Sequence, residues 1–187
     1  MKVFEGITKI IDNFPFPIVG IDSDNGAEFI NKHLLKYCEE NRITFTKSRA
    51  YNKNDSCYVE QKNWTIVRKT VGYWRYETEK EVGLLNQIYL YLRLYTNFFQ
   101  PCMKCIMRSR IGSKIIKRYD VAKTPYQRVI ECGGVEERMK KKLNEIYKNL
   151  NPAELKRKIT QLQEELFERV RRKRIYERNL EKEEVFV

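Results

Sequence analysis

The sequence contains a single histidine, and it has no run of apolar residues that approaches the length of a membrane span. A spanning helix needs about 20 such residues, so we expect no membrane-embedded segment. The five cysteines are an odd number without the spacing of a disulfide framework, which predicts reduced thiols in an intracellular protein. Cys102 and Cys105 form one C-x-x-C pair. Neither a second pair nor a nearby histidine completes a zinc site, so we expect two half-buried thiols.

The sequence nevertheless has enough apolar material to fold. Hydrophobic residues make up 42% and aromatic residues 12%, which argues against wholesale disorder despite the high content of charge. Basic residues outnumber acidic ones by 37 to 25, and the excess is concentrated in residues 61–134, which carry 14 basic and 5 acidic side chains. Such a surface attracts polyanions, so nucleic acid is the leading predicted partner and an anionic membrane the weaker one.

Apolar spacing predicts alternating helices and strands in the first half. Positions 4, 7, 10 and 11 fit a helical face that ends at Pro15, and residues 18–21 fit a buried strand that runs into a polar turn. A helix over 27–42 and a strand over 43–46 follow. After a polar loop at 48–57, helices are predicted from residue 58 and over 78–99, the second being closed by Pro101.

The second half predicts a basic hairpin and a helical tail. The hairpin strands are expected at 104–108 and 114–119, with a turn at 109–113, and helical patterns resume at Thr124. In the tail, apolar residues recur at positions 155, 159, 162, 166 and 170, a seam that fits packing on the body or on a second copy. We therefore expect three parts: a core over 1–100, a basic hairpin segment over 101–134 and a helical tail over 135–187.

Two carboxylates stand out by their context. Asp24 follows the predicted strand at 18–21, and Glu60 falls in the first turn of the helix that begins near residue 58, with 35 residues between them. The spacing alone is weak evidence, because an aspartate before Asn-Gly is more often a turn former than a catalyst.

The residues around these two carboxylates strengthen the case. Residues 24–29 (DNGAEF) and 54–64 (NDSCYVEQKNW) resemble the signature of bacterial insertion-sequence transposases and of the retroviral-type integrase core, members of the DDE superfamily. The resemblance extends through residues 98–101 (FFQP) and 123–128 (KTPYQR), and it covers most of residues 18–165.

The resemblance implies an α/β fold, namely part of a ribonuclease H-like integrase core followed by the basic hairpin and helical tail. In this family three carboxylates gather two Mg²⁺ (or Mn²⁺) ions for phosphodiester cleavage and strand transfer, and Asp24 and Glu60 match two of them as catalytic and metal-binding residues. By motif position, candidates for shaping the site or touching DNA are Asn25, Gly26, Asn54, Gln61 and Asn63. For Gln61 and Asn63 a solvated helix face fits equally well. Arg68, Lys69 and Arg75 fit phosphate contact, although any surface helix can carry such charge.

The sequence departs from the family pattern at its beginning. The family's first catalytic aspartate lies on an earlier strand, whereas only 17 residues precede the predicted strand at Ile18. Asp12, in or just after the first helix, and Asp22, two residues before Asp24, do not convincingly replace it. We therefore expect an N-terminally truncated chain that is inactive alone, unless an upstream segment or a partner supplies the third carboxylate.

The resemblance also bears on partners and location. We expect DNA, and a homo-oligomer or full-length transposase, as partners in the bacterial cytoplasm at the nucleoid, and no small-molecule substrate. The alternative is a non-catalytic product that binds DNA or transposase through Lys and Arg around residues 104–128 and modulates transposition. A product without function is the third possibility.

Overall fold

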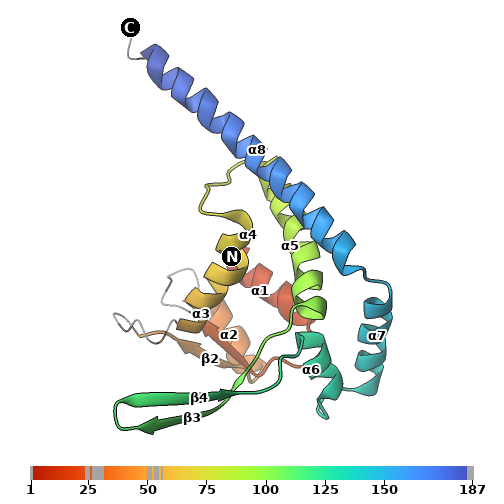
Figure 1. The fold of residues 1–187 in the computed structure, drawn as a ribbon. Helices are drawn as coiled ribbons and strands as arrows, with labels where there is room; N and C mark the ends of the chain where they lie inside the picture. Colours follow the sequence, from red (N-terminus) through yellow and green to blue (C-terminus); the bar gives the residue numbers. More distant parts are fainter. Residues whose placement is uncertain are drawn as a thin grey trace. The chain divides into compact units, whose positions relative to one another are not determined.

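The chain is a mixed α/β protein with many helices and two small sheets (Figure 1). The computed structural model describes residues 2–23, 26, 32–49, 52, 55 and 57–184. Backbone contacts divide the chain into two compact units, Met1–Tyr73 (unit 1) and Trp74–Val187 (unit 2). The division therefore falls well before residue 100, where the sequence suggested the end of a core.

Unit 1 alternates helices and strands in the order that the sequence predicts. Helix α1 (Lys2–Asp12) and strand β1 (Gly20–Ser23) are followed by helix α2 (Lys32–Glu40) and strand β2 (Thr44–Lys47). Three short helical segments complete the unit: α3 (Cys57–Lys62), the π-helix η1 (Asn63–Arg68) and α4 (Lys69–Val71). Residues 27–31, part of the predicted second helix, lie outside the described residues.

The two strands of unit 1 form a parallel pair, and the core of the unit covers one face of this pair. Gly20 lies opposite Thr44 and Ser23 opposite Lys47, so the two strands end together. The core comprises three buried residues and the partly buried side chains packed on them: Leu34, Cys38, Ile43, Phe4, Ile7, Ile11, Ile18, Ile21, Tyr37 and Phe45. Because side chains alternate along a strand, Ile21 and Phe45 point into this core. The alternate residues Gly20, Asp22, Thr44 and Thr46 are exposed.

Unit 2 consists of helices and one hairpin. Helix α5 (Glu79–Phe99) leads to strands β3 (Cys105–Ile111) and β4 (Lys114–Tyr119), which pair in antiparallel fashion. Helices α6 (Pro125–Glu131), α7 (Glu137–Lys148) and α8 (Pro152–Glu184) follow. The hairpin is longer than predicted, since Ile111 pairs with Lys114 and only Gly112 and Ser113 form the turn. Gly112 has φ = +61°, a backbone conformation that glycine adopts without steric cost.

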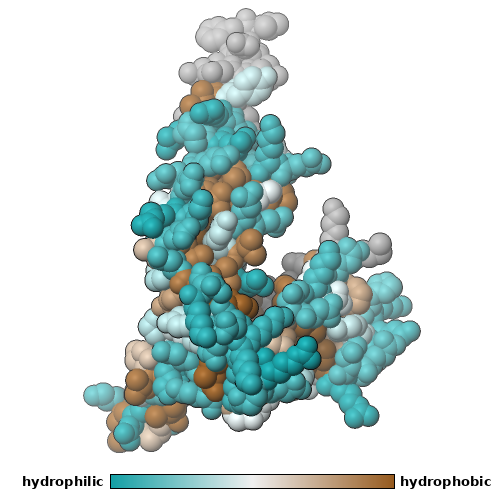
Figure 2. All heavy atoms as spheres, turned by 90° about the vertical axis from the view of Figure 1, so that its right-hand side faces the viewer, coloured by the Kyte–Doolittle hydropathy of each residue, from teal (hydrophilic) through white to brown (hydrophobic). Residues whose placement is uncertain are grey.

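The long helix α8 packs along α5 within unit 2. Four residues of the predicted seam are buried: Leu155, Ile159, Leu166 and Val170. They belong to the helix that packs on α5, and the buried residues of α5 include Leu84 and Ile88. On the face shown in Figure 2, hydrophilic side chains cover most of the surface, with apolar side chains between them. Of the two alternatives for the seam, packing within the chain is therefore the one that the structure contains.

Over the residues that the structure describes, no helix combines the length and the apolar character needed to cross a membrane. The expectation of half-buried thiols at Cys102 and Cys105 was wrong, because both side chains are exposed. Cys102 lies in the exposed segment before β3, and Cys105 is the first residue of that exposed strand.

A buried carboxylate fixes the beginning of α5. Glu81 is only 2% exposed, and its side chain accepts hydrogen bonds from the backbone N–H groups of Glu77 and Thr78, both at 2.8 Å. The Thr78 hydroxyl in turn accepts from the Glu81 N–H at 3.2 Å, so the two residues form a reciprocal cap. Burial opposes ionisation of Glu81, but the hydrogen bonds from Thr78 and Glu77 outweigh it and lower the pKa of this carboxyl below its usual value.

We expect Glu81→Gln to destabilise the protein by about 1–2 kcal/mol at neutral pH, because it replaces two charge-assisted hydrogen bonds by neutral ones. Urea unfolding followed by circular dichroism at pH 7 measures the difference. A carboxyl whose pKa is lowered by folding stabilises above its unfolded value, so the difference shrinks as the pH falls below about 4.5. Glu79→Gln, at an exposed position of the same turn, serves as the control. An equal loss in both variants would contradict the cap.

Candidate metal and nucleic acid site

The carboxyl ends of β1 and β2 are tied together just before Asp24. The Ser48 N–H donates to the Ser23 carbonyl oxygen at 3.0 Å, one residue beyond the last paired position of β2. Both serines are buried. Asp24 is the next residue after β1 in the sequence and lies outside the described residues, as do Asn25 and Asn54. The point at which the chain leaves β1 toward Asp24 is therefore fixed beside the end of β2.

An ion pair closes the loop that follows β2. The guanidinium of Arg49 donates to both carboxylate oxygens of Asp55, from Nε at 2.7 Å and from Nη2 at 3.0 Å. The backbone N–H of Arg49 donates to the same carboxylate at 3.2 Å. We call this group the Arg49–Asp55 clamp. Because Asp55 precedes α3 by two residues, the clamp holds the beginning of α3 close to the end of β2.

Each partner of the clamp stabilises the charge of the other, and the hydrogen bond to Asp55 raises the pKa of the Arg49 guanidinium. The hydrogen bond from the Arg49 side chain, the bond from its backbone N–H and its positive charge together lower the pKa of Asp55 from 3.8 to about 2. Asp55 is consequently ionised at neutral pH and is fully engaged by Arg49. It holds the loop in place and does not act as a free ligand.

Glu60 lies in the first turn of α3 and differs from Asp55 in its surroundings. Its side chain is exposed, and it makes no ion pair with any residue in the described ranges. Gln61 and Asn63 are exposed as well, on α3 and at the beginning of η1. A π-helical segment such as η1 is rare and frequently occurs at functional sites. This part of the chain offers a carboxylate and two amides to solvent.

The basic residues that follow have different environments. Arg68 is half-buried, its guanidinium lies 4.6 Å from the centre of the Tyr73 ring, and it donates to the Gly72 carbonyl oxygen at 3.4 Å. Lys69 is exposed. Arg75 belongs to unit 2, where it pairs with Glu77 at 2.6 Å. Within unit 1 only Lys69 is therefore a wholly exposed cation among the three predicted phosphate contacts.

The structure describes both acidic residues that the sequence raised as substitutes for the missing aspartate. Asp22 lies on the exposed face of β1, and one of its carboxylate oxygens accepts a hydrogen bond from the Thr46 hydroxyl at 2.7 Å. Asp12 is exposed at the end of α1. Gly26, the remaining residue of the predicted Asp-Asn-Gly turn, is half-buried.

The described side chains do not by themselves form a metal centre. No group of three His, Cys, Asp or Glu side chains suited to a metal ion occurs among them. The carboxylate of Glu60 is a hard oxygen donor of the kind that Mg²⁺ prefers, and it is accessible. The donor chemistry of Glu60 therefore fits Mg²⁺.

Sequence reasoning missed the clamp. Arg49 and Asp55 are six residues apart in a polar loop, and no helical or strand periodicity relates them. The one available signal is that residues 48–57 contain a single acidic side chain together with two basic ones.

Comparisons with known proteins give one relative. No protein-family model matches the chain, and no solved structure matches it. An uncharacterized protein, y4rM of Sinorhizobium fredii (strain NBRC 101917 / NGR234), is 43% identical over 115 residues. The matched segment is 62% of this chain and 33% of that protein, so the chain spans about a third of the length of the curated relative.

We expect the carboxyl of Asp55 to titrate with a midpoint near pH 2, and Arg49→Gln to return the midpoint toward the ordinary value of 3.8. The side-chain carboxyl carbon of Asp55, followed by NMR, measures both. Arg42→Gln removes an exposed arginine of the same unit that has no contact with Asp55 and should leave the midpoint unchanged. A midpoint that does not move in Arg49→Gln would exclude the clamp.

Proposed function

We propose that this chain is a segment of a DDE-type transposase in which unit 1 is part of a ribonuclease H-like core. Asp24 and Glu60 would supply two of the three carboxylates of a Mg²⁺-dependent site. The observation that carries the proposal is the closure of one edge of unit 1. The Ser48–Ser23 hydrogen bond ties the end of β1 to the end of β2. The Arg49–Asp55 clamp holds the beginning of α3 near that same end of β2.

The roles of the two carboxylates follow from their positions. Asp24 is the next residue in the sequence after β1, and Glu60 occupies the first turn of α3, whose beginning follows the clamp. The exposed carboxylate of Glu60 has no cation to compete for it among the described residues, whereas Asp55 is occupied by Arg49. When bound, two Mg²⁺ or Mn²⁺ ions polarise the attacking and leaving oxygens of a phosphodiester.

Other residues of unit 1 would position DNA. Gln61 and Asn63 present amides next to Glu60 on the exposed side of α3 and η1, where they can donate to phosphate oxygens. Lys69 is available for a phosphate, while the stacking of Arg68 on Tyr73 holds its guanidinium on the helix surface. Asn25, Gly26 and Asn54 remain candidates by motif alone. A third carboxylate would come from a longer form of the chain or from a partner copy.

The alternative is a non-catalytic product that binds DNA or a full-length transposase. The exposed basic hairpin of unit 2 favours this role, since it offers cations without any contribution from Asp24 or Glu60. Replacement of these two carboxylates distinguishes the alternatives, because a binding role tolerates it.

Mn²⁺, a paramagnetic substitute for Mg²⁺, tests the site in the purified full chain. We expect Mn²⁺ to broaden the NMR signals of the backbone amides next to Asp24 and Glu60 first, and Asp24→Asn and Glu60→Gln each to weaken this broadening several-fold, because each removes one oxygen ligand. Glu39→Gln, which neutralises an exposed carboxylate on α2, is the matched control. Broadening that is the same in all four proteins would overturn the proposal.

Activity provides the second arm of the test. The purified chain alone should show no Mg²⁺-dependent strand transfer, because two carboxylates do not complete the site. A form extended at its beginning to include an upstream aspartate should gain the activity, and lose it in Glu60→Gln. Strand transfer by the chain alone would show that its own residues complete the site.

A further inference from the structure

The β3–β4 hairpin (Cys105–Ile111 and Lys114–Tyr119) is exposed on both faces. Every residue of the two strands is exposed except Ser109, which is half-buried. Within the described part of the chain no third strand pairs with this hairpin. Figure 1 shows it as a long ribbon that extends from the helices of unit 2. An isolated two-stranded hairpin is at best marginally stable in water, so the ribbon needs support at its base.

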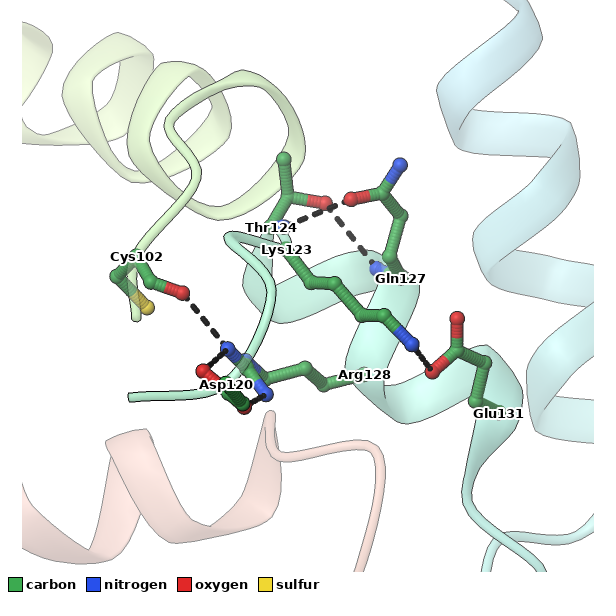
Figure 3. A network of polar contacts seen from close by, with 7 residues as sticks. All are labelled: Cys102, Asp120, Lys123, Thr124, Gln127, Arg128 and Glu131. Atoms are coloured by element: carbon green, nitrogen blue, oxygen red, sulfur yellow. Dashed lines mark hydrogen bonds and ion pairs between the residues drawn. The ribbon is translucent and has the colours of Figure 1, made fainter. Parts of the chain in front are cut away.

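That support is a polar network between the two ends of the hairpin and α6 (Figure 3). The guanidinium of Arg128 donates to Asp120 at 2.6 and 3.2 Å and to the Cys102 carbonyl oxygen at 2.7 Å. The Lys104 N–H donates to the same carboxylate at 2.6 Å. These contacts, that of Arg128 first, hold the pKa of the Asp120 carboxyl below its usual value. Its charge is therefore maintained at neutral pH.

Backbone pairing and a helix cap complete the base. Cys102 and Lys123 exchange two backbone hydrogen bonds, at 3.0 and 3.2 Å. The side chains of Thr124 and Gln127 cap α6 reciprocally. Both ends of the ribbon are thus fixed to α6, so the direction in which it leaves that helix is set.

The ribbon carries positive charge without compensation. Residues 104–119 contain no acidic side chain. In the described structure none of the following cations of the strands forms an ion pair: Arg108, Arg110, Lys114, Lys117 and Arg118. Elsewhere in unit 2 such pairing is common, as for Lys140 with Glu137 and Arg169 with Glu165. The uncompensated cations indicate a polyanionic ligand.

The cations are distributed over both faces. Cross-strand partners share a face, so Arg108 and Lys117 lie on one face of the ribbon, and Arg110 lies two residues along on that same face. Met107 is paired with Arg118 and Ile111 with Lys114, which places these two cations on the opposite face. A flat anionic surface, such as a membrane, would engage only one face. A ligand that flanks the ribbon on both sides can engage all five.

The major groove of B-form DNA is such a ligand. It is about 12 Å wide, admits a two-stranded ribbon and has a phosphate chain along either side. Seven residues of β3 at about 3.4 Å each make a ribbon roughly 24 Å long, enough to follow the groove over several base pairs. The major groove of duplex RNA is too narrow for side chains to read.

We propose that the β3–β4 ribbon is a duplex-DNA-binding element that lies in the major groove, with cations of its two faces on the two flanking phosphate chains. This inference rests on the alternative function, DNA binding by the exposed hairpin, and names the ligand and its groove. It does not depend on the metal site, because the ribbon belongs to unit 2 and uses neither Asp24 nor Glu60. Arg128 and Asp120 are positioning residues that fix the base of the ribbon and do not contact DNA.

The test measures binding of the full chain to a fluorescent 24-base-pair duplex in EDTA, by anisotropy over a range of salt concentrations. Two charge-neutralised variants address the two faces: Arg108→Gln with Lys117→Gln, and Lys114→Gln with Arg118→Gln. Each pair should weaken binding roughly tenfold and reduce the slope of log K against log salt by about 2, since each removes two phosphate contacts. The matched control, Lys141→Gln with Lys142→Gln on exposed positions of α7, should change neither quantity.

Further duplexes identify the groove. Glucosylated hydroxymethylcytosine fills the major groove and should abolish binding, whereas netropsin, which fills the minor groove, should leave it intact. Duplex RNA and vesicles of phosphatidylserine should bind at least about tenfold more weakly than DNA. The proposal would be overturned if the variant of only one face lost DNA affinity, or if the α7 control lost as much affinity as the ribbon variants. Inhibition of binding by netropsin alone would also overturn it. Because EDTA removes divalent ions, the result of this binding assay does not depend on the metal site. A negative result in the Mn²⁺ experiment would therefore leave the DNA-binding proposal unaffected.

Discussion

A bidentate bond between an arginine and an aspartate is the interaction on which each candidate site depends. In unit 1 Arg49 and Asp55 close the loop between β2 and α3, and in unit 2 Arg128 and Asp120 fasten the base of the β3–β4 ribbon. Ion pairs on a protein surface contribute little to stability when each partner moves freely. Here the guanidinium or the carboxylate also bonds to backbone groups, so each pair restricts the chain as well as balancing charge.

The same two pairs explain which charged groups are left for function. Arg49 and Arg128 engage Asp55 and Asp120, and the pKa of each aspartate is lowered, so these four groups are committed to structure. Glu60 in unit 1 and the cations of the ribbon in unit 2 have no such partner in the described ranges. Charge that is not used to hold the chain together is the charge available to bind an external ligand.

Periodicity predicted most elements because it depends on burial, and burial here follows local pattern. The stripe of Phe4, Ile7 and Ile11 gave α1, and the apolar run before Asp22 gave β1, although that strand begins two residues later than expected. The hairpin was also predicted, with its second strand at the observed residues and its first strand too short, because the pairing of Ile111 with Lys114 depends on turn geometry at Gly112.

Features set by contacts between distant side chains could not be predicted in this way. The partners of the Arg128 network come from three segments, and those of the clamp from a loop without periodicity. The assignment of α5 to unit 2 follows from its packing on α8, some 70 residues later. The candidate site itself was predicted only from motif resemblance, and the positions of Asp24, Asn25 and Asn54 fall outside the described residues, so their roles stay predictions.

The unpaired edge of the sheet in unit 1 bears on the third carboxylate of the proposed metal site. In the described structure β1 pairs only with β2, which leaves its other edge unpaired, and an open edge readily pairs with another strand. A strand added beside β1 would run alongside Gly20 to Ser23, the last residue before Asp24 in the sequence. For the proposed metal site, one added strand, from a longer form of this chain or from a partner, would therefore pair with this edge of the sheet and offer a place for the third carboxylate.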